Sequence, residues 1–467
     1  MSRKHTPGAV PTGEPARPLS PLERWYWICD QLSPLNVVGH TRLHGALDPD
    51  TARRALSSLQ ARHPLLRVAI EAEADGTRPR FRPAPDRPIP LRTVRVPADA
   101  PEPDADAHWE REVNAHELVT AVNSTAGPLA RALLVTRTGV DGAPDTHDLV
   151  LTLSHVIADG TTVLTLARQW IELAAAVLAA GDAEPPAVST LRTLPPPEGL
   201  LPAGHRGAAG LRKVIGQQLA ERDLAKKLAP RRFEPTERVP FDRRVTQLLT
   251  RSITGEDLAA LIEACKREQT TVHGALTAAM ALAAAKDAGD EPGPFTIGSP
   301  ITFREALDPV VREDEVGTYV ATVPSIVDHR PGAPLWPIAR SVARDLSRRR
   351  RHGEHLTSVA SLGPVAPKSV AKSERFLTFM QEKGPITLCV SNVGRFDFPD
   401  EVGPWRVTRA EFVAGLSVNA YYCASITTAH DRLSWNFTHV EGAVDADRAL
   451  RLADASVEAL LAAVKSS

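Results

Sequence analysis

One ten-residue stretch of the 467-residue chain, residues 151–160, holds the residues best suited to chemistry. Its sequence is LTLSHVIADG, so His155 is followed four positions later by Asp159 and then by Gly160. An imidazole can act as a general acid or base near neutral pH, and a nearby carboxylate can orient it or help it to bind a metal. Two such side chains share a metal most readily from one face of a helix, and this stretch does not have a helical pattern. We therefore expect acid–base chemistry here and no metal site.

A strand and a helix are predicted on either side of His155. Residues 149–153 alternate Leu, Val, Leu, Thr, Leu, which predicts a strand whose leucine face would also carry the histidine. The Asp-Gly pair at 159–160 breaks this alternation. Apolar residues then recur with helical spacing over residues 161–180, and Gly181 is typical of a helix end. The sequence thus predicts a strand that delivers a histidine to a tight turn, followed by a buried helix.

A lone buried histidine satisfied by local hydrogen bonds would fit the same residues. However, the string from His155 to Gly160 resembles the HxxxDG signature of the acyltransferases that depend on CoA or carrier proteins. This superfamily contains the condensation domains of nonribosomal peptide synthetases, the plant BAHD enzymes, wax ester synthases and the polyketide-associated acyltransferases of actinobacteria. Many condensation domains have a second histidine where this chain has Ser154, whereas BAHD and polyketide-associated members often lack it.

Three later segments also resemble this superfamily. Residues 295–304 are similar to a strand that ends in an arginine, and residues 316–320 to the glycine-bearing strand after it. Residues 386–394 are similar to the Ser-Asn-x-Gly segment of the polyketide-associated and alcohol acyltransferases. The DFGWG string of BAHD enzymes is absent from the sequence. The resemblance is therefore closest to the polyketide-associated and alcohol acyltransferases of actinobacteria.

Composition limits the class of protein. The formal net charge of −1 gives no electrostatic reason to expect binding to nucleic acid or to an anionic membrane. The four cysteines are scattered without a CxxC pair, which favours a reducing cytoplasm over a disulfide framework or a zinc site. No stretch of 18 uninterrupted apolar residues is present, so we expect no transmembrane segment.

The length of the chain suits two domains. Residues 1–18 are polar and rich in proline, without an apolar signal segment, and predict a disordered tail. Residues 19–180 form the expected N-terminal half with the HxxxDG motif, and residues 244–467 form the C-terminal half. Between them, residues 181–243 contain proline-rich stretches and predict a crossover linker.

The resemblance implies an α/β fold of two domains with mixed sheets, each similar to chloramphenicol acetyltransferase. An active-site tunnel would lie at their interface, with His155 as the general base in its middle. Asp159 would form a structural pair with Arg304 from the other half, beside Gly160 in the turn. Asn392 and Ser391 are candidates for binding the substrate or the oxyanion.

The implied reaction moves an acyl group from a thioester of CoA or of a phosphopantetheinyl carrier protein to a hydroxyl acceptor, in lipid or polyketide specialised metabolism. Two alternatives stay open: a freestanding amide-forming condensation enzyme that uses carrier proteins in trans, and a catalytically inactive condensation-like domain that binds a carrier protein. We expect a monomer with no bound cofactor. The basic run from Arg348 to Arg351 predicts either an exposed helix end or a surface for an acidic carrier protein or CoA phosphates.

Overall fold

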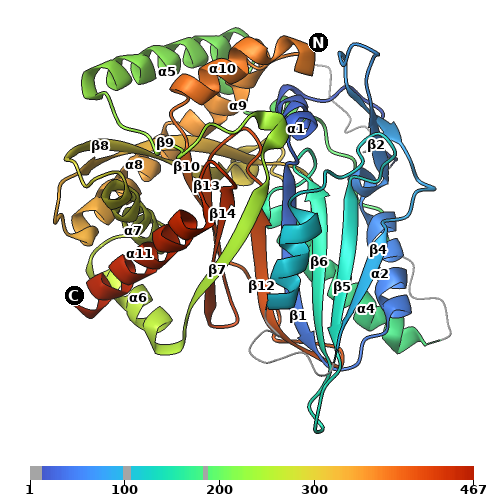
Figure 1. Ribbon diagram of the computed structural model, residues 1–467. Coiled ribbons are helices and arrows are strands. Elements are labelled where there is room, and N and C mark those ends of the chain that lie inside the picture. The colour runs from blue at the N-terminus through green and yellow to red at the C-terminus, as the bar shows by residue number, and fades with distance from the viewer. Residues whose placement is uncertain (1–12, 98–106, 182–187, 467) are drawn as a thin grey trace, which may run out of the picture.

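The computed structural model describes residues 13–97, 107–181 and 188–466. Within these ranges the strands form two six-stranded sheets, one in each of two lobes that lie side by side (Figure 1). A separate two-stranded ribbon consists of β2 (Val68–Glu71) and β3 (Arg80–Pro83). The predicted α/β class with two mixed sheets is confirmed.

The first sheet is antiparallel except for one parallel pair at its edge, β4 with β5. Across the sheet the strands are β11 (Glu401–Val402), β12 (Trp405–Ala414), β1 (Asn36–His44), β6 (Thr146–Ser154), β5 (Ala130–Arg137) and β4 (Leu91–Val96).

The second sheet has parallel pairs at its centre, where β10 lies between β13 and β8. Across the sheet the strands are β7 (Thr246–Thr254), β14 (Arg432–Val440), β13 (Tyr422–Ala429), β10 (Leu388–Arg395), β8 (Gly293–Thr302) and β9 (Val320–His329).

One segment of the chain crosses from the second lobe to the first. Strands β11 and β12 follow β10 of the second sheet in the sequence, yet they complete the first sheet, where β12 pairs with β1. A buried polar cluster holds this pairing: the His40 ring lies 3.0 Å from Glu411 on β12 and 2.8 Å from Asp148 on β6. The Trp109 ring stacks on His40 with centroids 3.9 Å apart. The predicted C-terminal half, 244–467, therefore supplies two strands to the sheet of the N-terminal half.

Helices cover both faces of the first sheet. On one face, α2 (Pro49–Arg62) packs on α4 (Gly160–Ala180), and the Trp170 indole donates a hydrogen bond to the carbonyl of Ala52. On the other face lie α3 (Ala107–Glu112) and a π-helical turn, Val113–Glu117. Among the described helices, α4 is long and apolar enough to cross a membrane, but 56% of its apolar stretch is buried inside the protein. Burial to this extent is typical of a helix in the core of a folded protein.

Four helices pack on one face of the second sheet: α6 (Gly255–Arg267), α7 (Val272–Asp287), α8 (Leu335–Arg351) and α11 (Ala446–Lys465). Above the same sheet lie α5 (Gly207–Leu228), α9 (Glu354–Val365) and α10 (Glu374–Lys383) (Figure 1). The first helix of the chain, α1 (Pro21–Leu32), packs against α9 and α10 and so joins the first lobe to the second.

Two predicted connecting regions are described in part. Residues 1–12 of the predicted disordered tail lie outside the described residues. In the described part of the tail, Arg17 makes a bidentate ion pair with Glu23, and Pro18 forms an isolated β-bridge with Arg80. Of the predicted crossover, 181–243, residue 181 and residues 188–243 are described. There it contains α5, and Arg192 pairs with the buried Glu315.

Candidate active site

The turn that carries His155 is held from both lobes. The alternation predicted His155 on the leucine face of the strand. Strand β6 instead ends at Ser154, so the histidine lies just beyond it. Its backbone N–H donates to the carbonyl of Leu35 at 3.0 Å. Its own carbonyl accepts a hydrogen bond of 2.6 Å from the Thr318 hydroxyl, which precedes β9 of the second sheet. The backbone of the histidine is therefore fixed at the junction of the lobes.

The imidazole of His155 stacks on the ring of Tyr26, with centroids 4.2 Å apart and planes 12° from parallel. Nδ1 is buried and has no hydrogen-bond partner among the described residues, whereas Nε2 remains open to a cavity. Burial lowers the pKa of His155 below its usual 6.5, and the carboxylate of Asp159 offsets part of this effect. Because burial disfavours the charged form, the ring is neutral at pH 7 and its open nitrogen can accept a proton.

Asp159 caps the helix that follows the histidine. Its Oδ1 accepts a hydrogen bond of 2.8 Å from the N–H of Thr162 in the first turn of α4. Its Oδ2 accepts another of 2.8 Å from the N–H of Tyr319 in the second lobe. The predicted partner, Arg304, approaches Oδ1 to 3.5 Å. The structure therefore brings the predicted pair together, but the shortest contacts of the carboxylate are to backbone N–H groups.

Arg304 lies just after β8 and forms hydrogen bonds with the loop of residues 312–317. Its Nη1 donates to the carbonyls of Arg312 (3.1 Å) and Glu315 (2.8 Å), and its Nη2 donates to the hydroxyl of Thr162. Its guanidinium lies 4.6 Å from the centroid of the Tyr319 ring. Because the arginine does not line the cavity, its role in this geometry is to support the turn.

The loop that Arg304 holds was predicted to be part of a strand. Residues 316–319 instead form an irregular segment, and β9 begins only at Val320. The N–H of Tyr319 bonds Asp159, and the carbonyl of Gly317 accepts from the hydroxyl of Thr162 at 2.7 Å. This part of the prediction is wrong because these backbone groups bind the helix cap instead of a neighbouring strand.

Gly160 lies very close to strand β12. A Cβ at this position would lie 2.8 Å from the ring of Phe412 on β12. Real Cβ atoms essentially never come this close, so with any other residue either the Phe412 ring or the turn would have to move.

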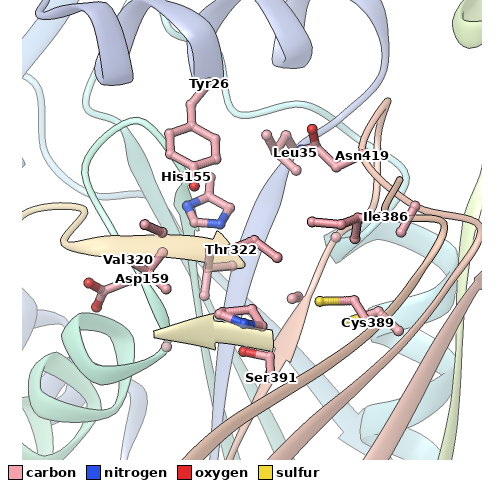
Figure 2. A pocket seen from close by; sticks show the side chains of 18 of the residues that line it. Tyr26, Leu35, His155, Asp159, Val320, Thr322, Ile386, Cys389, Ser391 and Asn419 are labelled. Carbon is pink, nitrogen blue, oxygen red and sulfur yellow. The ribbon is translucent and has the colours of Figure 1, made fainter. Parts of the chain in front are cut away.

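A cavity of about 340 Å³ lies between the lobes at the open nitrogen of His155. Its walls are mostly apolar, as expected for a site that binds an acyl chain or another apolar group. Figure 2 shows the imidazole below Tyr26, with Thr322, Ile386, Cys389 and Ser391 around the same space. Of the sequence-predicted site residues, His155, Asp159, Gly160, Ser391 and Asn392 line this cavity.

Asn392 lines the cavity, and its amide oxygen is engaged by the backbone. Its Oδ1 accepts from the N–H of Gly394 at 2.7 Å, within an irregularity of β10 where Gly394 has a φ of 79°. A backbone N–H must be met by the amide oxygen, so the amide NH₂ is the group left for a ligand. A donor in this position can stabilise a developing oxyanion.

The basic run at the end of α8 is largely paired. Arg348 and Arg349 contact Asp345 and Glu354, and Arg350 contacts Glu305. A second hollow of about 420 Å³ lies beside this helix end, and its lining includes Lys213, Arg350, Arg351, His205 and His355. It adjoins the first cavity, because Thr302 lines both.

The sequence did not reveal several residues that shape the site. These are Tyr26, which stacks on the imidazole, and Thr162 and Thr318, whose hydroxyls connect the turn to the second lobe. The aromatic cluster around Tyr26 was visible in the sequence, but core packing explains such a cluster equally well. Among the described residues, no group of three or more His, Cys, Asp or Glu side chains is placed to hold a metal ion.

Comparison with known proteins gives two sequence matches. Residues 244–419 match the family model described as the C-terminus of phthiocerol/phthiodiolone dimycocerosyl transferase. A segment of 159 residues, 33% of this chain, is 29% identical to the chondramide synthase cmdD of Chondromyces crocatus. That match spans only 4% of the synthase.

Solved structures match over nearly the whole chain. The first condensation domain of the calcium-dependent antibiotic synthetase, in complex with a substrate analogue, aligns with a TM-score of 0.67 and 16% identity over 96% of both chains. Polyketide synthase associated protein 5 from Mycobacterium tuberculosis aligns with a TM-score of 0.64 and 15% identity over 98% of this chain and 99% of the other. The epimerization domain from the third module of tyrocidine synthetase B gives 0.66 and 16% over 100% and 99%.

Identities this low show the fold alone, and the reactions named for these proteins differ. The fold nevertheless agrees with the family model matched by the second half of the chain. The chain thus has the two-lobed fold of the condensation domains, and its predicted resemblance to the superfamily of condensation domains and polyketide-associated acyltransferases is confirmed.

Proposed function

We propose that this protein transfers an acyl group from a thioester, carried by CoA or by a carrier protein, to a hydroxyl acceptor in lipid or polyketide metabolism. The observation that carries the proposal is the neutral His155, whose Nε2 opens into an apolar cavity between the lobes while its backbone is fixed from both sides. The resemblance to polyketide-associated acyltransferases supports a hydroxyl acceptor.

The proposed reaction needs one base and one donor. Nε2 of His155 removes the proton of the acceptor hydroxyl as its oxygen forms a bond with the thioester carbonyl carbon. The amide NH₂ of Asn392 is the proposed donor to the resulting oxyanion. When the carbon–sulfur bond breaks, the imidazolium returns the proton to the leaving thiolate, so the products are an ester and a thiol. The protein carries no acyl group in this scheme.

The runner-up function is amide formation with carrier proteins in trans. It is favoured by the condensation domains among the structural matches and by the partial match to chondramide synthase. An amine acceptor would use the same base and cavity, so the geometry at His155 fits both reactions. The hollow beside Arg351 and Lys213 is the proposed place for phosphate groups of either donor.

Purified protein should be tested with acyl-CoA donors of graded chain length and with acylated carrier protein. Each donor should be offered an aliphatic alcohol and the matching primary amine, and ester, amide and free thiol should be measured by mass spectrometry. We expect ester with release of one thiol per ester. Exclusive amide formation would establish the runner-up, and release of no thiol from any donor would favour the inactive carrier-binding domain.

The rate of transfer should depend on pH through His155. A general base works only when it is unprotonated, so kcat should rise as pH increases through the pKa of this residue. Because burial lowers that pKa below 6.5, the acid limb of the profile should have its midpoint below pH 6.5, and activity should be constant from there to pH 8. A midpoint above 7 would contradict the neutral, buried imidazole.

A further inference from the structure

The ring of Tyr26 stacks directly on the imidazole of the proposed base. The two rings are almost parallel, 12° apart, with centroids at 4.2 Å. Tyr26 lies on α1, whose N-terminus is closed by a capping box of Ser20 and Glu23. On the next residue of the helix, the Trp25 ring packs edge-on against Phe376 of α10 at 5.1 Å. Tyr26 is therefore carried by a helix that is fixed to both lobes.

The other contacts of the imidazole do not include a hydrogen bond of good geometry on its buried nitrogen. A histidine used as a base or metal ligand is commonly oriented by a hydrogen bond from its second ring nitrogen. Here the second nitrogen, Nδ1, is buried and makes no hydrogen bond of good geometry, although hydrogen bonding to backbone groups of His155 and Ala158 raises the pKa of the imidazole in part. The backbone contacts to Leu35 and Thr318 fix where the side chain starts, but they do not fix the plane of its ring.

We propose that Tyr26 is a positioning residue for His155, whose ring sets the imidazole plane by stacking and so aims Nε2 into the cavity. This inference rests on the proposed role of His155 as the base. Stacking adds a flat contact surface to the weak backbone contacts of the imidazole. It also covers one face of the imidazole and keeps water from it.

Two effects of the tyrosine ring on the imidazolium oppose each other. Contact with an aromatic face attracts a cation and would raise the pKa of His155. Burial acts in the other direction, and burial is the largest influence on this pKa, which is lowered. Removing the ring should therefore let water reach the imidazole and move the pKa of His155 up toward 6.5.

The hydroxyl of Tyr26 can be separated from its ring. Burial raises the pKa of Tyr26 well above its usual value of 10, so the phenol stays neutral through any practical assay. Tyr26→Phe keeps the stacking surface and removes only the hydroxyl. Tyr26→Leu removes the flat ring, and Tyr26→Met fills more of the same volume without one, should the leucine variant fail to fold.

The test compares these variants with Trp27→Leu, which removes a buried aromatic ring from the same helix without contacting the cavity. The pKa of His155 is followed by NMR of ¹³C-histidine-labelled protein, with its signal assigned by its loss in His155→Ala. The value of kcat is measured at saturating substrates.

For Tyr26→Leu or Tyr26→Met we expect a higher His155 pKa and a kcat lower by roughly 10- to 100-fold, since a small misplacement of a reacting group costs up to about this factor. Tyr26→Phe should keep the wild-type pKa and kcat within about threefold, and Trp27→Leu should leave the pKa unchanged.

Three results would overturn the proposal. The first is an unchanged His155 pKa or kcat in the variants that lack the ring. The second is an equal loss of kcat in Tyr26→Phe, which would assign the effect to the hydroxyl. The third is an equal shift of the His155 pKa in Trp27→Leu, which would assign the effect to the general packing of α1. The NMR titration needs no turnover, so it tests the stacking even if His155 proves not to be the base. Full activity of His155→Ala, by contrast, would defeat the proposed function and not the measured stacking.

Discussion

Replacing His155 by alanine should lower kcat for acyl transfer by at least about 10²-fold, because a positioned general base contributes roughly 10²- to 10⁴-fold to a rate. The substitution removes the nitrogen that faces the cavity and leaves the backbone bonds to Leu35 and Thr318 in place. The fold should therefore survive, as judged by circular dichroism and thermal unfolding. The acid limb of the pH profile should disappear from whatever activity remains.

A matched control is available in another buried histidine. His63 lies outside the cavity, bonds the side chain of Gln169 at 2.7 Å, and has a pKa lowered by burial to about 4. His63→Ala should destabilise the protein but keep the transfer rate per folded molecule. A folded His155→Ala protein with the full transfer rate would remove the histidine from the mechanism.

The second large effect concerns the pair of Asp159 and Arg304, which are 145 positions apart in the chain and both almost fully buried. Asp159→Ala removes a helix cap and leaves the arginine without its ion-pair partner. Losing one partner of a buried pair costs about 3–5 kcal/mol of unfolding free energy. Arg304→Ala should cost a similar amount, because it also frees the carbonyls of Arg312 and Glu315.

The double variant distinguishes a shared interaction from two independent ones. If the pair is coupled, the loss of unfolding free energy in Asp159→Ala/Arg304→Ala should be smaller than the sum of the single losses by about 0.5–3 kcal/mol. The exposed pair of Arg53 and Asp50 gives the control, since Arg53→Ala should change stability by less than about 1 kcal/mol. Strict additivity at Asp159 and Arg304 would mean that the two backbone N–H bonds, and not the arginine, hold the carboxylate.

Local features of the site could be predicted from the sequence because they depend on residues near one another. The alternation before His155, the break at Asp159-Gly160 and the apolar period after it correspond to β6, the turn and α4. The predicted partner Arg304 lies within reach of Asp159, although this came from family resemblance rather than from any local pattern.

The rest of the site depends on distant segments meeting, and no pattern in one chain shows this. The stacking of Tyr26 on His155 needs α1 to cross the end of β6. The irregular segment before β9 resembles a strand of the superfamily in sequence, but Tyr319 uses its N–H to bind Asp159. The size of the cavity depends on side chains from both lobes, which pack only in the folded molecule.

The exchange of β12 has a consequence for how the protein is made. The contact between His40 and Glu411 joins residues 371 positions apart, and β1 has no neighbour on that side until β12 arrives. We therefore expect the first sheet to stay incomplete during synthesis, with an open edge that can pair with other chains, until residue 414 has left the ribosome. The turn at His155 also takes its shape late, since Phe412 packs against Gly160 from this last strand. We therefore expect the two lobes to unfold as one cooperative unit, although each has a sheet of its own.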